Sequence, residues 1–197
     1  MQLVEQHIIG KGDPRFQAID NAAFASKNLY NAANYILRQE FIFNNRYIPY
    51  EELAKEIKET PDYKALPAKV AQQVLIVLDK NWKSFFAAIE EWKAKKSKFN
   101  GRPKLPKYKD KQKGRNLLIY TIQAISKPKL QQGIIKPSGL NILIKTKQKE
   151  VNQVRIVPRK THYVIEVVYT QKETQAQVNK NYIAGVDIGL NNLAAVA

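Results

Sequence analysis

The sequence predicts an α+β fold in which a bundle of helices is followed by an antiparallel sheet or barrel. The main observation is a change of hydrophobic period along the chain. Apolar side chains recur at helical spacing through residues 14–96 and alternate as in strands from about 117 to 169. The chain has 197 residues, 44% of them apolar, which is enough for one substantial core or two small ones.

The first third of the chain predicts a short strand and then helices. Residues 2–9 alternate loosely and end at a turn sequence, Gly10-Lys11-Gly12-Asp13-Pro14. Apolar residues then recur at roughly helical spacing, which predicts a long helix over about 14–44. A short helix is expected near 51–59, and Thr60-Pro61-Asp62 is expected to stop it.

The strongest helical pattern begins at Pro67 and runs to about Lys96. One face carries an apolar stripe made of Val70, Val74, Val77, Leu78, Phe85, Ile89 and Trp92. Aromatic residues can stack on bases, but among aliphatic residues at helical spacing they indicate a buried face. We therefore expect this stripe to form core.

Residues 93–115, called the basic tract below, carry eleven basic residues and only one acidic residue, Asp110. Pro103, Pro106 and two glycines prevent a continuous helix there, so an extended segment is predicted. Phe99 and Tyr108 are candidate stacking platforms within it. The tract is expected to clamp a phosphate backbone; the alternative is a solvated, flexible linker.

Beyond the basic tract the period becomes two, which predicts an antiparallel sheet or barrel. The expected strands cover about 117–125, 133–136, 140–145, 151–157 and 163–169. Basic residues lie at their edges, namely Lys136, Lys145, Lys147, Lys149, Arg155, Arg159 and Lys160. Residues 171–180 are polar and resemble a linker.

The charge balance indicates a polyanionic partner. The chain has 33 Lys and Arg against 17 Asp and Glu, a formal net charge of +16. Nucleic acid is the expected partner, and a membrane surface is the weaker alternative. The sequence has neither an apolar run of membrane-spanning length nor a secretory signal, so we expect a soluble, cytoplasmic protein with no membrane partner. With no cysteine and only His7 and His162, no zinc site is expected in this portion.

Residues 182–196 predict an apolar strand, a tight polar turn around Gly189, and a returning strand. Asp187 lies inside the first strand, where an unpaired carboxylate is costly, so a divalent metal ion is expected beside it. RNase H-like nucleases place their first metal-binding Asp on such a strand. Actin-like ATPases use a similar hairpin for phosphates, but normally at the start of the chain. A buried Asp bonded to a turn backbone is the structural alternative.

Four motifs in order make the chain resemble the N-terminal half of TnpB-type RNA-guided transposon endonucleases, relatives of type V CRISPR effectors. They are Asn28-Leu29-Tyr30-Asn31-Ala32-Ala33-Asn34, Leu66-Pro67 with Gln72-Gln73, Gly101-Arg102-Pro103-Lys104-Leu105-Pro106-Lys107-Tyr108-Lys109, and Gly185-Val186-Asp187-Ile188-Gly189-Leu190.

The resemblance implies a domain order for the chain. A basic oligonucleotide-binding-type β-barrel would begin with its first strand in 1–12, and a helical recognition domain would be inserted at 13–98. The basic segment and the rest of the barrel would occupy 99–178. Residues 179–197 would form the first β-hairpin of an RNase H-like (RuvC) domain.

The implied function is binding of a guide RNA and of target DNA that carries a short adjacent motif, in the cytoplasm of a prokaryote at the nucleoid. Base pairing would supply sequence specificity. Asp187 would be the first catalytic and metal-binding acid. A complete two-metal Mg²⁺ site needs later acids that lie beyond residue 197 in the family, so we expect residues 1–197 to need a C-terminal nuclease half for cleavage. Alternatives are a nuclease-free RNA-guided DNA-binding repressor and, more remotely, an actin-like ATPase fragment.

Candidate nucleic-acid contacts come from three places. Lys69 and Gln73, four residues apart on one helix, are expected to read the DNA motif together with Asn116. The remaining contacts are expected from the basic tract and the sheet edges: Lys98, Arg102, Lys104, Lys107, Tyr108, Lys109, Lys111, Lys113, Arg115, Arg155, Arg159 and Lys160.

Overall fold

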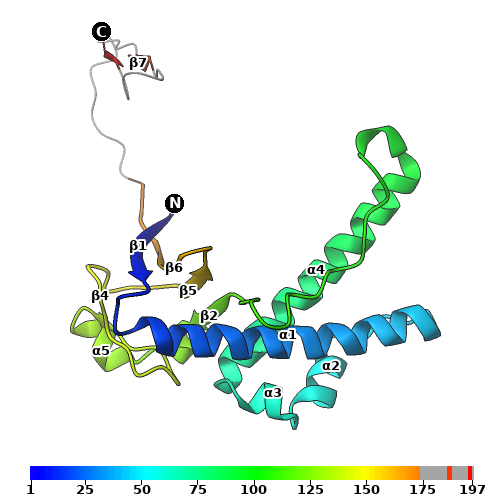
Figure 1. Cartoon of the computed structure of the whole chain (residues 1–197). Helices are drawn as coiled ribbons and strands as arrows, with labels where there is room; N and C mark the ends of the chain where they lie inside the picture. Colours follow the sequence, from blue (N-terminus) through cyan, green and yellow to red (C-terminus); the bar gives the residue numbers. More distant parts are fainter. Residues whose placement is uncertain (174–185, 188–194, 197) are drawn as a thin grey trace.

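The structure is a computed structural model of the chain and describes residues 1–173, 186–187 and 195–196. The helices are α1 (Phe16–Asn44), α2 (Tyr50–Ile57), α3 (Pro61–Lys64), α4 (Ala68–Ala94) and α5 (Lys127–Gln131), with 3₁₀ turns η1 (Lys96–Lys98) and η2 (Ile122–Ala124). The strands are β1 (Gln2–Gly10), β2 (Leu118–Thr121), β3 (Ile134–Ile135), β4 (Ile144–Lys145), β5 (Gln153–Pro158), β6 (His162–Thr170), β7 (Val186–Asp187) and β8 (Ala195–Val196). Figure 1 shows the strands of the main sheet and α5 at one end of the described part, from which α1 runs toward α2, α3 and α4.

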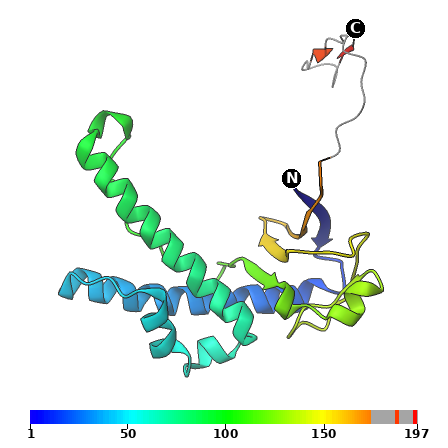
Figure 2. The same cartoon turned by 180° about the vertical axis from the view of Figure 1, so that it is seen from behind.

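The helical part is built on α1 and α4, which cross and then diverge, with α2 and α3 on the opposite side of α1 from the outer half of α4 (Figures 1 and 2). Trp82 is fully buried at the crossing. It packs among Phe41, Tyr47, Phe85 and Phe86 at centroid separations of 5.6–6.1 Å. These edge-on and tilted contacts bury large apolar area, so they account for why two long helices stay together here.

The main sheet is antiparallel and has the strand order β1-β6-β5-β2. β1 and β6 pair over their full lengths, from Gln2↔Thr170 to Gly10↔His162. A second, two-stranded sheet pairs β3 with β4. Among the described residues the backbone hydrogen bonding does not close into a barrel. Strands β3 and β4 have two residues each, too few to continue the ladder from β2 round to β1.

A side chain bridges the gap between β1 and β4. The carboxylate of Glu5 on β1 accepts hydrogen bonds from the Thr146 hydroxyl, the Lys147 backbone N–H and the Gln148 amide at 3.2–3.3 Å. Burial raises the pKa of Glu5, but these bonds and one from His7 outweigh it, so the pKa falls below its usual value. The sheet is thus an open one tied by polar contacts at its edge.

Three local expectations differ from the structure. The predicted strand over 117–125 is cut to four residues because Ile122–Ala124 turns, and α5 follows because Pro128 fits a first helical turn. Thr60-Pro61-Asp62 starts helix α3 as well as ending α2, since the Thr60 hydroxyl accepts a bond from the Tyr63 N–H at 3.4 Å. Of the predicted strand 140–145, only Ile144 and Lys145 pair.

The predicted α+β class, the two predicted long helices, which are α1 and α4, and the antiparallel sheet are confirmed. β7 pairs with β8, Val186 opposite Val196 and Asp187 opposite Ala195. The turn predicted between them and the linker predicted before them fall on 188–194 and 174–185, outside the described residues. The assignment of the pair to a RuvC-type domain stays a prediction.

Candidate nucleic-acid interface

The extended part of the basic tract is docked along one face of α1 by its backbone. Figure 1 shows the chain returning from the outer end of α4 along α4 and α1 to β2. Five α1 side chains, called the anchor face below, donate to its carbonyl oxygens: Lys27, Tyr30, Asn31, Asn34 and Arg38. Their spacing of three, one, three and four residues places them on one side of the helix.

The anchor bonds hold four successive parts of the tract. Asn34 and Arg38 each donate to the Pro106 carbonyl at 3.0 Å. Asn31 exchanges two bonds with the Lys109 backbone, donating to its carbonyl and accepting from its N–H, both at 2.9 Å. The other two donors reach the carbonyls of Lys107, at 3.3 Å from Tyr30, and Lys111, at 2.7 Å from Lys27.

Docking by the backbone leaves the lysine side chains pointing away from the protein. Lys104, Lys107, Lys111 and Lys113 are exposed, and none of the four forms an ion pair within the described part of the chain. The tract is therefore an ordered row of cations rather than the flexible linker that was its alternative. Because the backbone is already docked, phosphate binding has to order only the lysine side chains, which costs less entropy than ordering a mobile loop as well.

Two exposed aromatic side chains belong to this region, Tyr108 in the tract and Tyr35 on α1. Tyr108 is 44% exposed, and the Arg38 guanidinium lies 5.0 Å from its ring centroid. Tyr35 follows one turn after Asn31 on α1 and is 56% exposed. Lys109 is half-buried, with Nζ 5.2 Å from the centre of the Tyr30 ring, and burial lowers its pKa. A surface that combines exposed rings with cations is typical of single-stranded nucleic-acid binding.

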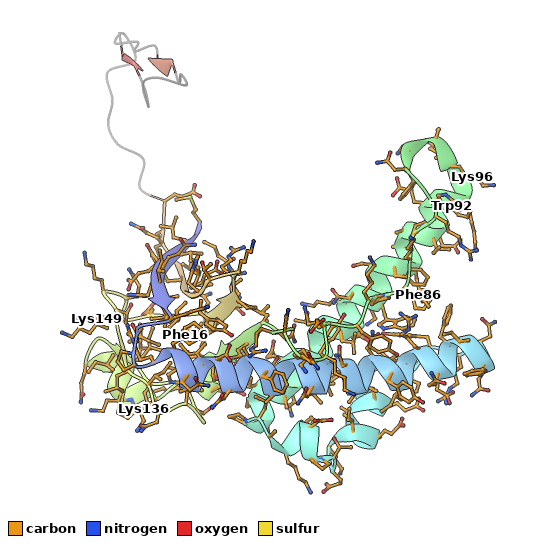
Figure 3. The ribbon with its side chains drawn as sticks, in the orientation of Figure 1. Phe16, Phe86, Trp92, Lys96, Lys136 and Lys149 are labelled. Carbon is orange, nitrogen blue, oxygen red and sulfur yellow. The ribbon has the colours of Figure 1, made fainter. Side chains whose placement is uncertain are left out.

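The outer end of α4 carries a second basic group around Trp92, which Figure 3 labels together with Lys96. Lys96 Nζ lies 5.2 Å and the Arg102 guanidinium 5.8 Å from the Trp92 ring. Lys98 is paired with Glu91 at 3.3 Å on an exposed surface. Arg102 and Lys98 thus remain accessible from solvent, and the tract carries positive charge from this end to β2.

Arg115 and Asn116, the last tract residue and its neighbour, have structural partners inside the protein. Arg115 donates two bonds to the Asp20 carboxylate, at 2.8 and 2.7 Å, and Asp20 also accepts a 2.6 Å bond from the Tyr163 hydroxyl. Asn116 is buried; its amide donates to Ser26 Oγ at 3.1 Å. Both residues therefore position the tract on α1. Of the two, only Arg115 remains partly exposed to solvent.

The predicted motif readers are only partly brought together. Gln73 and Asn116 line one small hollow between α4 and β2, although Asn116 uses its amide internally. Lys69 lies exposed in the first turn of α4. Contact of Lys69 or Gln73 with DNA stays a prediction.

The predicted contacts on the sheet divide into two kinds. Arg155 on β5 pairs with Glu166 directly opposite on β6, at 2.8 Å. Arg159 and Lys160 are exposed in the β5–β6 turn. Figure 3 shows Lys136 and Lys149 projecting outward from the same end of the molecule. The sheet end therefore adds charge of its own, and Arg159 and Lys160 lie next to the end of the basic tract.

Asp187 lies on β7, and its side chain falls outside what the structure describes. No group of three or more His, Asp or Glu side chains in the described part of the chain is arranged to hold a metal ion. His7 lies on β1 and His162 on β6. No helix in the described ranges is long and apolar enough to cross a membrane.

The anchor face is the feature of this candidate interface that the sequence did not reveal. Lys27 is only 2% exposed, and its ammonium lies over the Phe24 ring at 3.7 Å, so a residue type normally at the surface is used in the interior. Asn31 and Asn34 belong to the motif that resembles TnpB-type proteins, which was the one indication available. Comparison with known proteins adds no assignment, because no family model and no curated protein matches this chain.

Proposed function

We propose that this chain is the guide-RNA- and target-DNA-binding portion of an RNA-guided DNA endonuclease of transposon origin. One observation carries the nucleic-acid part of the proposal: the basic tract is docked backbone-inward on α1, with Lys104, Lys107 and Lys111 facing solvent. The assignment to TnpB-type nucleases rests on the motif resemblance, and two of its four motifs, in α1 and in the tract, contact each other.

The physical argument starts from charge. A net charge of +16 repels itself in a folded chain, and a row of ordered lysines concentrates that repulsion. Binding an RNA backbone relieves it and releases counterions, so association is favourable and sensitive to salt. Tyr35 and Tyr108 supply rings for unpaired bases beside that row. A clamp of this kind grips backbone and leaves sequence to base pairing, as RNA-guided recognition requires.

Two further parts of the proposal concern the sheet and Asp187. We propose that the open sheet, tied at Glu5, acts as an oligonucleotide-binding-type barrel that adds contacts for the guide RNA. We also propose that Asp187 is the first Mg²⁺ ligand of a RuvC-type site that other acids complete. Aspartate oxygens suit Mg²⁺, and two such ions would serve in-line phosphodiester cleavage.

The test compares two variants that lose the same charge. The first is Lys104→Gln, Lys107→Gln and Lys111→Gln together; the control is Lys55→Gln, Lys58→Gln and Lys64→Gln, exposed residues of the α2–α3 region across α1 from the tract. Fluorescence anisotropy with a structured RNA should show the tract variant about tenfold weaker or more, and the control within about twofold of the parent. Equal weakening in both variants would mean that the tract lysines contribute to RNA binding only through the net charge of the chain.

Salt dependence supplies an independent measurement. Four exposed lysines on phosphates predict a slope of log affinity against log salt of about −3, and the tract variant should have a slope shallower by about 2 to 3. A parent that binds neither RNA nor DNA at low salt, or a slope near zero, contradicts the proposed function.

A further inference from the structure

A pocket at the start of α1 brings together cations from three separate parts of the chain. It has a volume of about 300 Å³. Its basic residues are Lys11 from the β1–α1 turn, Lys113 and Arg115 from the end of the basic tract, and Arg159 and Lys160 from the β5–β6 turn. Phe16 and Tyr163 form its apolar wall, in edge-on contact at 5.4 Å. This is the turn pocket.

The fold itself builds the turn pocket. Gly10 pairs with His162 at the last position of the β1–β6 ladder, so the turn after Gly10 and the turn before His162 lie side by side. The Asp13 N–H bonds to the Gly10 carbonyl at 3.0 Å, and the Arg159 N–H to the His162 carbonyl at 2.9 Å, which closes both turns. The end of the basic tract reaches the same place because Asp20 on α1 holds Arg115.

The charge in the turn pocket is almost uncompensated. Among the residues that the structure describes, five cations line it and Asp20 is its only acid. Asp20 is already neutralised by both guanidinium bonds of Arg115. Within the described part of the chain no ion pair involves Lys11, Lys113, Arg159 or Lys160. Four like charges around one cavity make its electrostatic potential positive, which favours the entry of an anion.

We propose that the turn pocket binds phosphate and is the point at which the RNA is anchored at one end of the basic tract. This deepens the proposed function and rests on it. The net charge of the lining favours a dense anion, which is either a terminal triphosphate of the RNA or consecutive phosphates where its backbone bends into the pocket. Arg115 is pre-positioned by Asp20, and Thr161 adds a hydroxyl at the rim.

The first experiment uses inorganic triphosphate as the probe, without RNA, on the ¹⁵N-labelled chain. Amide shifts should change at Lys11, Arg159 and Thr161. Lys11→Gln, Arg159→Gln and Lys160→Gln together should weaken binding about tenfold or more, whereas the Lys55, Lys58 and Lys64 control should not. All three pocket side chains are exposed, so folding should persist; Lys160→Glu alone is a second variant, expected to give a similar loss. Equal binding by parent and pocket variants overturns the proposal.

The second experiment identifies the source of the phosphate, using one RNA made with a 5′-triphosphate or a 5′-hydroxyl end. If the parent binds the triphosphate RNA more tightly and the pocket variant does not, the 5′ terminus is the source of the phosphate. If the parent binds both RNAs equally and the pocket variant binds both more weakly, the bent backbone is the source of the phosphate. If the pocket variant binds both RNAs as the parent does, the pocket proposal fails while the proposed function stands. If the parent binds triphosphate at the pocket but no RNA, the proposed function fails instead.

Discussion

Asp20 is the residue at which α1, the basic tract and β6 meet. Its carboxylate accepts two bonds from Arg115 and one from Tyr163. The Arg115 guanidinium lowers the pKa of Asp20 below its usual value near 3.8, although burial opposes it, and the Tyr163 hydroxyl assists. A predicted nucleic-acid contact, Arg115, thus has a structural role first. Single basic residues cannot be assigned to function by type alone.

We predict that Asp20→Asn lowers the free energy of unfolding at pH 7 by about 1–3 kcal/mol, because it leaves the Arg115 charge without its partner in a partly buried site. Glu59→Gln, which loses only an exposed pair with Lys64, should leave the free energy of unfolding nearly unchanged. Urea denaturation measures both.

The same variant gives a test in acid. A carboxylate whose pKa is lowered by folding contributes stability above its unfolded pKa and loses it as the pH falls through the folded value. The difference between parent and Asp20→Asn should therefore shrink as the pH drops below about 4. A difference that stays constant down to pH 2 would mean that packing, not charge, accounts for the loss.

At the scale of elements, the pairing of α1 with the basic tract decides what the lysines can do. Residues 99–115 of the tract form no helix or strand, so their carbonyl groups need partners from elsewhere. The anchor face of α1 supplies them. Trp82 on α4 supports the arrangement, since its indole N–H donates to Asn34 at 3.0 Å while Asn34 holds Pro106. Helix, tract and helix are therefore one hydrogen-bonded unit.

We predict that Asn31→Ala loosens the tract, because both backbone groups of Lys109 lose their partner. Trypsin cleavage after Lys104, Lys107 and Lys111 should become several-fold faster, since cutting requires local opening of the docked segment. Asn21→Ala is the matched control: it lies on the same helix, is exposed, and bonds only to Gln17 at 2.8 Å. Mass spectrometry of the fragments gives the sites, and equal rates for both variants would count against docking by Asn31.

At the scale of the whole molecule, the helical part and the sheet part are joined at several points besides Asp20. The Asn116 N–H bonds to the Ala23 carbonyl of α1 at 3.0 Å. The turn before Leu140 packs on the start of α4, where Gly139 has a φ of +70° and a Cβ there would lie 2.4 Å from Pro67 Cγ. The structure therefore depends on a glycine that connects residues 72 positions apart in sequence.

We predict that Gly139→Ala destabilises the chain by about 2–4 kcal/mol, through the left-handed backbone and the clash with Pro67 together. Gly101→Ala should change stability by less than about 1 kcal/mol, because nothing lies within 4 Å of the added Cβ. Thermal melting of both variants decides the matter. A Gly139→Ala variant as stable as the Gly101→Ala control would show that the turn and α4 move apart freely.

The sequence by itself determined the α+β class, the long helices and the strand order along the chain, because hydrophobic period is a local property. It also located the cations, since charge is carried by residue type. It missed Trp82 in the core and the helix α5, where a single aromatic residue and a short Lys-Pro-Lys stretch carry little pattern.

Only the tertiary structure decided which cations are available to a ligand. Whether Lys104 faces solvent while Arg115 and Arg155 are paired depends on partners far away in sequence: Asp20 lies 95 residues from Arg115, and the Asn31 and Lys109 pair is separated by 78. The turn pocket forms because the β1–β6 register aligns two turns about 150 residues apart in the chain, a consequence of long-range pairing. Such contacts leave no local periodicity, and for that reason a pattern of residues along the chain cannot specify them.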